Sequence, residues 1–315
     1  MNSSNAVEGL QLGSIHKPTG CESCIYGKMH RAAFPHSHTK AKGIGDIICG
    51  DVGEVPVPTP EGHRYYSLLK DNFSNYTSVK LMKRKNEVDD HCINFAAMLK
   101  TQTGRDVKVL RTDQGTEYGG EKFNKWISRF GVIHQTTARY TPQQNGISER
   151  SNRTLMDGVR SILFTNDSSN QLAHNTRKSL LELWGEFLLA TVYIRNRTIT
   201  AKTDSTPFEK FFNKKPSIAH LRILGCRAFA HVPDALRRKL DPKAEACWLV
   251  GYCQDTKAWR LWNPTTRKII ISRDVIFDET VLIGNTPDLP KTGCNPCVPY
   301  LIVMETLNLV NTNIT

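Results

Sequence analysis

Three acidic residues occupy positions from which a folded sheet and a helix would bring their carboxylates together. Asp51 ends the apolar run IICGD, Asp113 closes the strand-like segment VKVLRTD, and Glu149 lies in the first turn of an expected helix. Gathered carboxylates repel one another, so such a site is costly unless cations neutralise it. Hard oxygen ligands favour Mg²⁺ or Mn²⁺. Two such ions would activate a hydroxyl and stabilise the leaving oxygen of a displacement at phosphorus.

Each acid also has a more ordinary interpretation. An Asp at a strand end usually forms a turn, and a Glu in the first turn of a helix usually interacts with the helix dipole. Residue type alone favours this interpretation for each acid taken singly. The choice therefore depends on the sequence around them.

The segments around Asp51 and Asp113 predict a sheet with both antiparallel and parallel strands. RYYSLLKDNFSNYTSVKLMK is typical of two strands joined by a turn, which makes a three-stranded meander with IICGDV. Apolar residues at helical spacing follow from Val88 to Leu99, and VKVLRTD then returns as a strand. A helix between two strands indicates parallel pairing, and GGEKFNKWISRFG followed by VIHQTTA repeats the unit. We therefore expect an α/β fold with a mixed five-stranded sheet and flanking helices.

Beyond the loop TPQQNG the helical pattern lengthens and then gives way to strands. We expect helices over about residues 147–164 and 178–195, separated by the polar loop NDSSNQLAHNT. From residue 221 onward short strand-like segments return with turn residues between them: RAFAHV, CWLVGY, AWRLWN and KIIISRDVIF. This pattern predicts a small C-terminal β-barrel-like domain.

Positive charge is concentrated in the C-terminal half of the chain. Residues 195–273 contain 17 basic and 6 acidic side chains, which is +11 of the net charge of +12. Such a basic surface is typical of a nucleic-acid partner, although a merely solvated surface gives the same composition. The basic candidates for DNA contact in this stretch are Arg237, Arg238, Lys239 and Lys243. The tryptophans near them are expected to be mostly core residues.

The nine cysteines indicate a reducing environment rather than a disulfide framework. Five stand singly among apolar or strand-like residues and are expected to be buried free thiols: Cys49, Cys92, Cys226, Cys247 and Cys253. The N-terminus has no signal-peptide pattern, and no run reaches the roughly 18 apolar residues of a membrane span. We therefore expect an intracellular protein with no membrane partner.

Two motifs around the second and third acids resemble the core of retroviral-type integrases. They are LRTDQGTEY and TPQQNGISERSNRTL, with 35 residues between Asp113 and Glu149. Further blocks resemble, in the same order, the integrase region of copia-type (Pseudoviridae-like) retrotransposon Gag-Pol polyproteins. These blocks are CESCIYGKMHRAAFP, HRYYSLLKDNFSNY, WGEFLLATVYIRNR, TPFEKFFNKKPSIAHLRILGC, RRKLDPKA, VGY and SRDVIFDE. The resemblance covers about residues 20–280, and the order of the blocks makes it specific.

The resemblance implies an RNase H-like core in which Asp51, Asp113 and Glu149 are catalytic and hold two Mg²⁺ or Mn²⁺ ions. It also implies contacts with DNA from a mobile loop before the catalytic helix and from that helix. The residues expected to make these contacts are Gln143, Gln144, Asn145, Arg150 and Arg153.

Cys21 and Cys24 have the spacing of a zinc knuckle, which in this family is completed by two histidines upstream. Only His16 precedes the two cysteines here. We therefore expect a partial Zn²⁺ site at most.

The resemblance also implies a domain organisation. Residues 1–45 are expected to be a truncated zinc-module remnant, 46–200 the catalytic core and 201–220 a linker. Residues 221–280 are expected to form a small basic SH3-like barrel, followed by a tail over residues 281–315.

The function that the resemblance implies is that of a retrotransposon integrase, a polynucleotidyl transferase and endonuclease. Such an enzyme processes the 3′ ends of the element's DNA and inserts it into host DNA. We expect it to act in the nucleus after a cytoplasmic assembly stage, with DNA as partner and as a homo-oligomer.

An alternative is an inactive remnant that only binds DNA or oligomerises. It is suggested by the missing histidines and by the sequence GDVGEVPVP after the first acid, where the family usually has Gly-Pro. A general RNase H-type nuclease fits less well, because TPQQNG and the blocks beyond residue 180 are integrase features.

Overall fold

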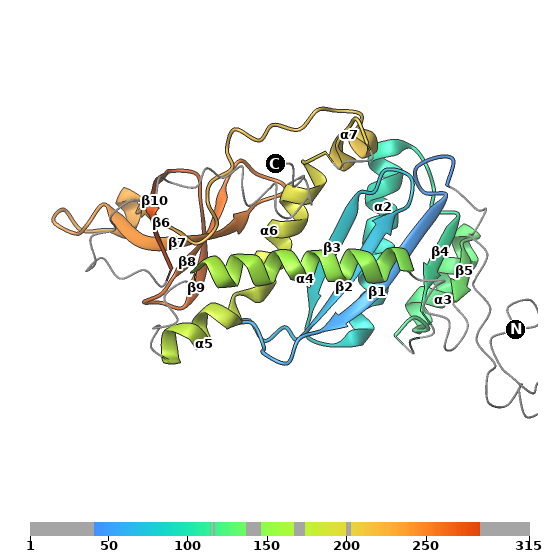
Figure 1. Ribbon diagram of the computed structural model, residues 1–315, viewed down its shortest axis with the longest axis horizontal. Helices are drawn as coiled ribbons and strands as arrows, with labels where there is room; N and C mark the ends of the chain where they lie inside the picture. The colour runs from blue at the N-terminus through green and yellow to red at the C-terminus, as the bar shows by residue number, and fades with distance from the viewer. Residues whose placement is uncertain are drawn as a thin grey trace, which may run out of the picture. The chain divides into compact units, whose positions relative to one another are not determined.

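The computed structural model describes residues 41–283, except residues 114, 116, 137–145, 167–173 and 200–202. Two sheets of five strands each organise this part of the chain. The first sheet and the helices packed on it belong to the part of the chain that contains the three acids, and Figure 1 shows the ribbon of both sheets. The predicted residues Cys21, Cys24, Gln143, Gln144 and Asn145 lie outside the described residues.

The first sheet is mixed, as the sequence predicts. Its strands are β1 (Ile47–Glu54), β2 (Tyr65–Asp71), β3 (Thr77–Met82), β4 (Val109–Thr112) and β5 (Ile133–Thr136). They lie in the order β3-β2-β1-β4-β5. β1, β2 and β3 form the antiparallel meander, whereas β4 runs parallel to β1 and β5 parallel to β4. This strand order gives the RNase H-like α/β core.

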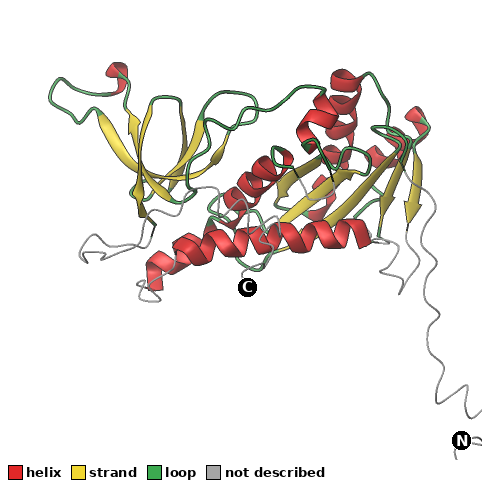
Figure 2. Ribbon diagram, turned by 45° about the horizontal axis from the view of Figure 1, so that its top comes forward, coloured by secondary structure: helices red, strands yellow, loops and turns green. Residues whose placement is uncertain are grey.

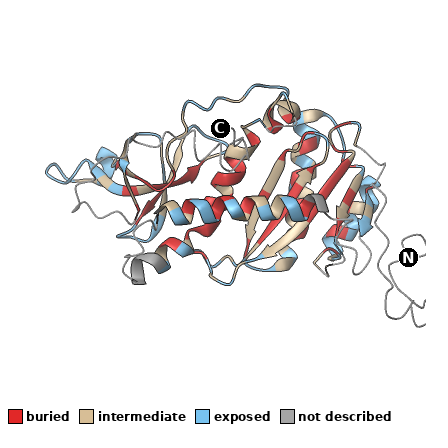
Figure 3. Cartoon of the chain, in the orientation of Figure 1, coloured by how far each residue is buried: buried red, intermediate tan, exposed pale blue. Residues whose placement is uncertain are grey.

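Helices cover both faces of this sheet (Figures 1 and 2). The helices before the second sheet are η1 (Lys85–Glu87), α2 (Val88–Thr103), α3 (Glu121–Phe130), α4 (Gly146–Asn166), α5 (His174–Glu182), α6 (Trp184–Asn196) and α7 (Pro207–Phe212). On one face α2 and α3 bury Phe95, Leu99 and Phe123 together with Leu69 of β2. On the other face α4 and α6 pack against alternate residues of the same strand, such as Leu68. The buried residues of these strands and helices lie where the helices pack against the sheet (Figure 3).

Two expectations about element boundaries are wrong. The predicted helix over residues 178–195 is two helices, because α5 ends at Glu182 and α6 begins at Trp184. Leu183, which separates the two helices, and Trp184 are both buried, so the break lies in the hydrophobic core. Asp51 does not end the first strand either. β1 continues to Glu54, because its antiparallel pairing with β2 extends as far as Tyr65.

The second sheet is antiparallel throughout and is of the predicted SH3-like type. Its strands are β6 (Cys226–His231), β7 (Ala244–Tyr252), β8 (Trp259–Asn263), β9 (Lys268–Ser272) and β10 (Val275–Leu282), with the short helix η3 (Asp234–Leu236) between β6 and β7. The strands lie in the order β10-β6-β7-β8-β9. Trp262 is buried, and Trp248 and Trp259 pack against the same hydrophobic cluster, as expected for core residues.

The cysteine prediction is confirmed for four of the five single thiols. Cys49, Cys92, Cys226 and Cys247 are buried and free, while Cys253 is partly exposed. None of the helices in the described part of the chain has the length and apolar character needed to cross a membrane.

Candidate active site

Asp51 lies on β1, and Asp113 directly follows β4, the neighbouring parallel strand. Cys49 of β1 pairs with Arg111 of β4. Asp51 comes two residues after Cys49, and Asp113 comes two residues after Arg111. Because parallel strands run in the same direction, this register brings the two carboxyl-bearing positions to the same end of the sheet. Glu149 lies in the first turn of α4, which packs on β1 and β2. The three acids therefore come from two strands and one helix, as predicted.

The electrostatics of Asp51 depend on both other acids. Burial raises the pKa of Asp51 to about 6, and the negative charges of Asp113 and Glu149 add to this increase. Opposing them, hydrogen bonds from the Val52 backbone and the Asn152 side chain favour the ionised form. Asp113 and Glu149 are therefore each close enough to repel the Asp51 carboxylate.

Hydrogen bonds fix the orientation of the two strand acids. The Val52 N–H donates to Oδ1 of Asp51 over 3.0 Å, and the side-chain amide of Asn152 donates to its Oδ2. The Gly115 N–H donates to Oδ1 of Asp113 over 3.2 Å. Both oxygens of Asp51 thus accept a hydrogen bond, and because a carboxylate oxygen has two lone pairs, each can still accept a cation.

Three carboxylates are a donor set that fits a hard divalent cation in type, and their repulsion would be relieved by one. Among the described residues, however, no three His, Cys, Asp or Glu side chains are already gathered as closely as ligands of a single ion. Asp113 and Glu149 are exposed, so their side chains have room to approach Asp51.

Asn152 is a site residue that the sequence interpretation did not single out. It lies three residues after Glu149 on α4, so the two side chains share a helix face. Its Oδ1 is buried and has no hydrogen-bond partner among the described residues, while its amide nitrogen binds Asp51. An asparagine three residues after a candidate acid in an expected helix is the sequence signal that would have identified Asn152.

Tyr118 lies beneath the strand acids. Its hydroxyl is buried and has no hydrogen-bond partner in the described part of the chain. Burial holds the pKa of Tyr118 well above its usual value, and the charges of Cys92, Asp51 and Asp113 act in the same direction. A Cβ atom on Gly50 would come within 3.1 Å of the Tyr118 hydroxyl, so glycine allows this ring to pack under β1.

The predicted basic residues fall into two groups. Arg150 and Arg153 follow Glu149 on α4, and both are exposed. The remaining four lie on the segment between β6 and β7, where Arg238, Lys239 and Lys243 are exposed. Arg237 is different, because its guanidinium is paired with Asp234 and its side chain is only 13% exposed.

Comparison with known families agrees with this architecture. Residues 42–142 match the integrase core domain, and residues 226–291 match the retroviral polymerase SH3-like domain. The mixed sheet of this strand order is RNase H-like, and the segment that contains Asp51 and Asp113 matches the integrase core domain. The chain thus carries an integrase core domain followed by a retroviral SH3-like domain, and the resemblance to copia-type elements is confirmed.

Pol polyproteins of plant transposons are among the relatives that the chain resembles in sequence. The chain is 34% identical over 294 residues, 93% of its length, to the retrovirus-related Pol polyprotein from transposon TNT 1-94 of Nicotiana tabacum. It is 28% identical over 269 residues, 85% of its length, to the corresponding polyprotein from transposon RE2 of Arabidopsis thaliana. The chain spans only 21% and 18% of these two relatives.

Two solved structures are also similar. One is the simian T-cell lymphotropic virus intasome in complex with PP2A regulatory subunit B56 gamma, at 17% identity and a TM-score of 0.43 over 81% of this chain and 86% of that one. The other is the HTLV-2 integrase catalytic core domain in complex with magnesium, at 16% identity and a TM-score of 0.38 over 55% and 99%. These scores are low, and the fold assignment depends on the strand order of the chain itself.

Proposed function

We propose that this chain is the integrase part of a retrotransposon Pol polyprotein and that it performs metal-dependent 3′-end processing and strand transfer. The observation that carries the proposal is the register of Asp51 and Asp113 on parallel strands, together with the influence of both Asp113 and Glu149 on the pKa of Asp51. Three acids that interact in this way would have no structural benefit without a cation.

Asp51, Asp113 and Glu149 would hold Mg²⁺ or Mn²⁺, most simply two ions. When bound, these ions would lower the pKa of the attacking hydroxyl and neutralise charge at the phosphorus oxygens. Asn152 would keep the Asp51 carboxylate in one orientation, and the Gly115 N–H would do the same for Asp113. With a pKa of about 6, Asp51 is mostly ionised at neutral pH and available as a ligand.

The chemistry proposed is two successive displacements at phosphorus. In end processing, water attacks a phosphodiester near the 3′ end of the element's DNA, and the bond to the 3′ oxygen breaks. In strand transfer, the 3′-hydroxyl so released attacks a phosphodiester of the target. One P–O bond forms as another breaks, and the proton lost by the attacking oxygen balances the one taken up by the leaving oxygen. No further reactant is needed.

DNA would be the partner in both steps. Arg150 and Arg153 follow Glu149 on α4, and the exposed Arg238, Lys239 and Lys243 add positive charge on the segment between β6 and β7. Gln143, Gln144 and Asn145 stay predicted contacts, and so does a partial zinc site at Cys21 and Cys24. A homo-oligomer acting in the nucleus is part of the same proposal.

The experiment is joining of a labelled oligonucleotide to plasmid DNA in Mn²⁺ or Mg²⁺, comparing the chain with Glu149→Gln. We expect joined product from the wild type and at least a hundredfold less from the variant, because one ligand charge is removed while the shape is kept. Binding of the same DNA should be equal in both. The alternative of an inactive remnant predicts DNA binding without joining in both proteins.

A further inference from the structure

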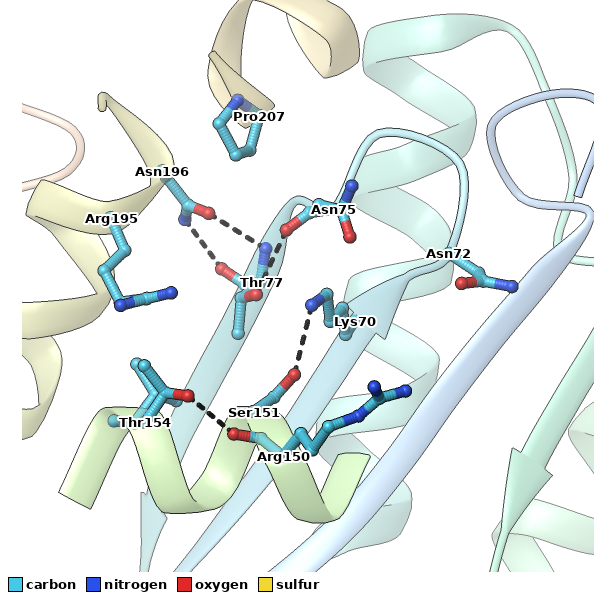
Figure 4. A pocket seen from close by; sticks show the side chains of 11 residues that line it. Lys70, Asn72, Asn75, Thr77, Arg150, Ser151, Thr154, Arg195, Asn196 and Pro207 are labelled. Atoms are coloured by element: carbon cyan, nitrogen blue, oxygen red, sulfur yellow. Dashed lines mark hydrogen bonds between the residues drawn. The ribbon is translucent and has the colours of Figure 1, made fainter. Parts of the chain in front are cut away.

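A hollow of about 330 Å³ lies between the start of α4, the end of α6 and the β2–β3 hairpin (Figure 4). Three basic side chains line it: Lys70 from β2, Arg150 from α4 and Arg195 from α6. No acidic residue is among the described residues that form its wall. Basic side chains on three sides of one partly enclosed space would attract an anionic group that enters it.

Lys70 is the basic residue set deepest in the sheet. It lies on β2, and its ammonium donates a hydrogen bond to the Ser151 hydroxyl over 3.1 Å. Burial lowers the pKa of Lys70 to about 8, and the positive charges of Arg195 and Arg150 lower it further. The three cations therefore interact across the hollow.

The wall opposite Lys70 is held in place by its own hydrogen bonds. The side chain of Asn196 accepts from the Thr77 N–H over 3.0 Å and donates to the Thr77 carbonyl over 2.7 Å. This pair joins the end of α6 to the first residue of β3 (Figure 4). A site whose walls are fixed before binding loses less conformational entropy when a ligand enters.

Two residues that line the hollow lie close to candidate acids along the backbone. Lys70 pairs with Cys49, and Asp51 is two residues further along β1, which is about 7 Å along the strand. Arg150 directly follows Glu149. A phosphate recurs at every nucleotide along a DNA strand, so a phosphate near the reacting one could lie at the hollow.

We propose that the hollow bounded by Lys70, Arg150 and Arg195 binds a backbone phosphate of the DNA strand whose neighbouring phosphodiester lies at the three acids. Hydroxyl and amide donors accompany the cations, as in other phosphate-binding sites. The hollow would set how far the strand extends past the acids. This inference rests on the proposed function, because it places the same DNA.

The first test is the salt dependence of binding of a fluorescein-labelled DNA duplex to the full chain, followed by fluorescence anisotropy. Removing one phosphate contact should lower the slope of log affinity against log salt concentration by about 0.9. We expect that loss for Lys70→Met and for Arg150→Gln, and retention of the slope in Lys70→Arg. Lys125→Met is the matched control, because Lys125 is an exposed lysine on α3, paired with Glu121. Its slope should equal that of the wild type.

The second test measures Lys70 directly in the wild type, which removes any question of folding in the variants. The rate of Lys70 acetylation, followed by mass spectrometry, should fall at least fivefold when the duplex is bound and should change little in inorganic phosphate alone. Equal protection by inorganic phosphate would assign the hollow to a free anion and overturn the DNA assignment. Unchanged slopes together with unprotected Lys70 would overturn the site altogether.

These outcomes are separate from those of the proposed function. A chain that joins no DNA, yet shows the slope loss and the protection, would sink the enzymatic proposal and keep the hollow as a DNA site. Joining activity with unchanged slopes would support the enzymatic proposal and count against the hollow as a DNA site.

Discussion

The side-chain amide of Asn152 on α4 donates a hydrogen bond to the carboxylate of Asp51 on β1. The two residues are 101 positions apart in the sequence. This bond connects the helix that carries Glu149 with the strand that carries the first acid. It therefore fixes the relative position of two of the three candidate metal ligands before any ion binds.

Replacing Asn152 by leucine should raise the pKa of Asp51 above its value of about 6. The hydrogen bond favours the ionised carboxylate, and losing a bond to a charged group costs about 1.5 kcal/mol, which is roughly one pKa unit. The measurement is titration of the Asp51 carboxyl carbon by NMR in the metal-free protein. Asn124→Leu is the control. Asn124 lies on α3, and its side-chain amide donates a hydrogen bond to the Gly119 carbonyl, away from Asp51. An unchanged titration in Asn152→Leu would show that the bond does not form in solution.

Replacing Asp51 by asparagine should stabilise the metal-free chain at neutral pH. The folded-state pKa of Asp51 is about 6, above the ordinary value of 3.8, so ionisation is harder in the folded protein than in the unfolded one. The free energy of unfolding therefore falls as pH rises from about 4 to about 6, and the loss persists above that. We expect Asp51→Asn to be more stable by on the order of 2 kcal/mol at pH 7 and equal to wild type near pH 3.5.

Urea denaturation at the two pH values measures this difference. Added Mg²⁺ should stabilise the wild type and leave Asp51→Asn largely unaffected. A variant that is less stable than wild type at pH 7 without metal would contradict the prediction.

Breaking the ion pair between Glu186 of α6 and Arg260 of β8 should destabilise the chain strongly. The guanidinium donates two hydrogen bonds, of 2.6 and 2.7 Å, to the two carboxylate oxygens, and the Glu186 side chain is only 9% exposed. Glu186→Gln leaves a partly buried charge on Arg260, which costs about 3 kcal/mol. The double variant Glu186→Gln, Arg260→Met removes both charges and should recover part of that loss. A double-mutant cycle by urea denaturation gives the coupling, and strictly additive losses would mean that the pair contributes nothing.

Removing positive charge between β6 and β7 should weaken DNA binding. Arg238 and Lys239 are exposed, and Leu236 and Leu240 beside them are 77% and 95% exposed. The double variant Arg238→Ser, Lys239→Ser should lower the salt slope of DNA affinity by up to about two. Lys257→Ser serves as the control, because Lys257 is an exposed lysine of the same sheet domain in the turn between β7 and β8. If both variants bind alike, the loss of charge matters only through the net charge of the domain.

Most of the fold could be predicted from local pattern. Alternation and turn residues gave the β1–β2–β3 meander, helical spacing gave α2 and α3, and a helix between two strands implied the parallel pairing of β1 with β4. The boundary errors had a common cause. The end of β1 and the break at Leu183 are decided by partners distant in sequence, namely the paired strand β2 and the core that buries Leu183 and Trp184.

The candidate site, like the fold, has a part that could be predicted from the sequence and a part that could not. The three acids could be named because motif and spacing are local properties of the chain. Asn152, Tyr118 and Lys70 could not, because each matters through a neighbour that is remote in the sequence. From sequence alone, a polar residue on a helix or a lysine on a strand is expected to be an ordinary surface residue.

The sequence by itself determined the class of fold, the identity of the three acids and the concentration of positive charge. Only the tertiary structure decided that Asp51 and Asp113 share a register, that Asn152 holds Asp51, and that Lys70, Arg150 and Arg195 surround one hollow. The physical reason is that charge and periodicity belong to single residues and short windows. Electrostatic interaction and hydrogen bonding instead fall off within a few ångströms, so they depend on which distant segments the fold brings together.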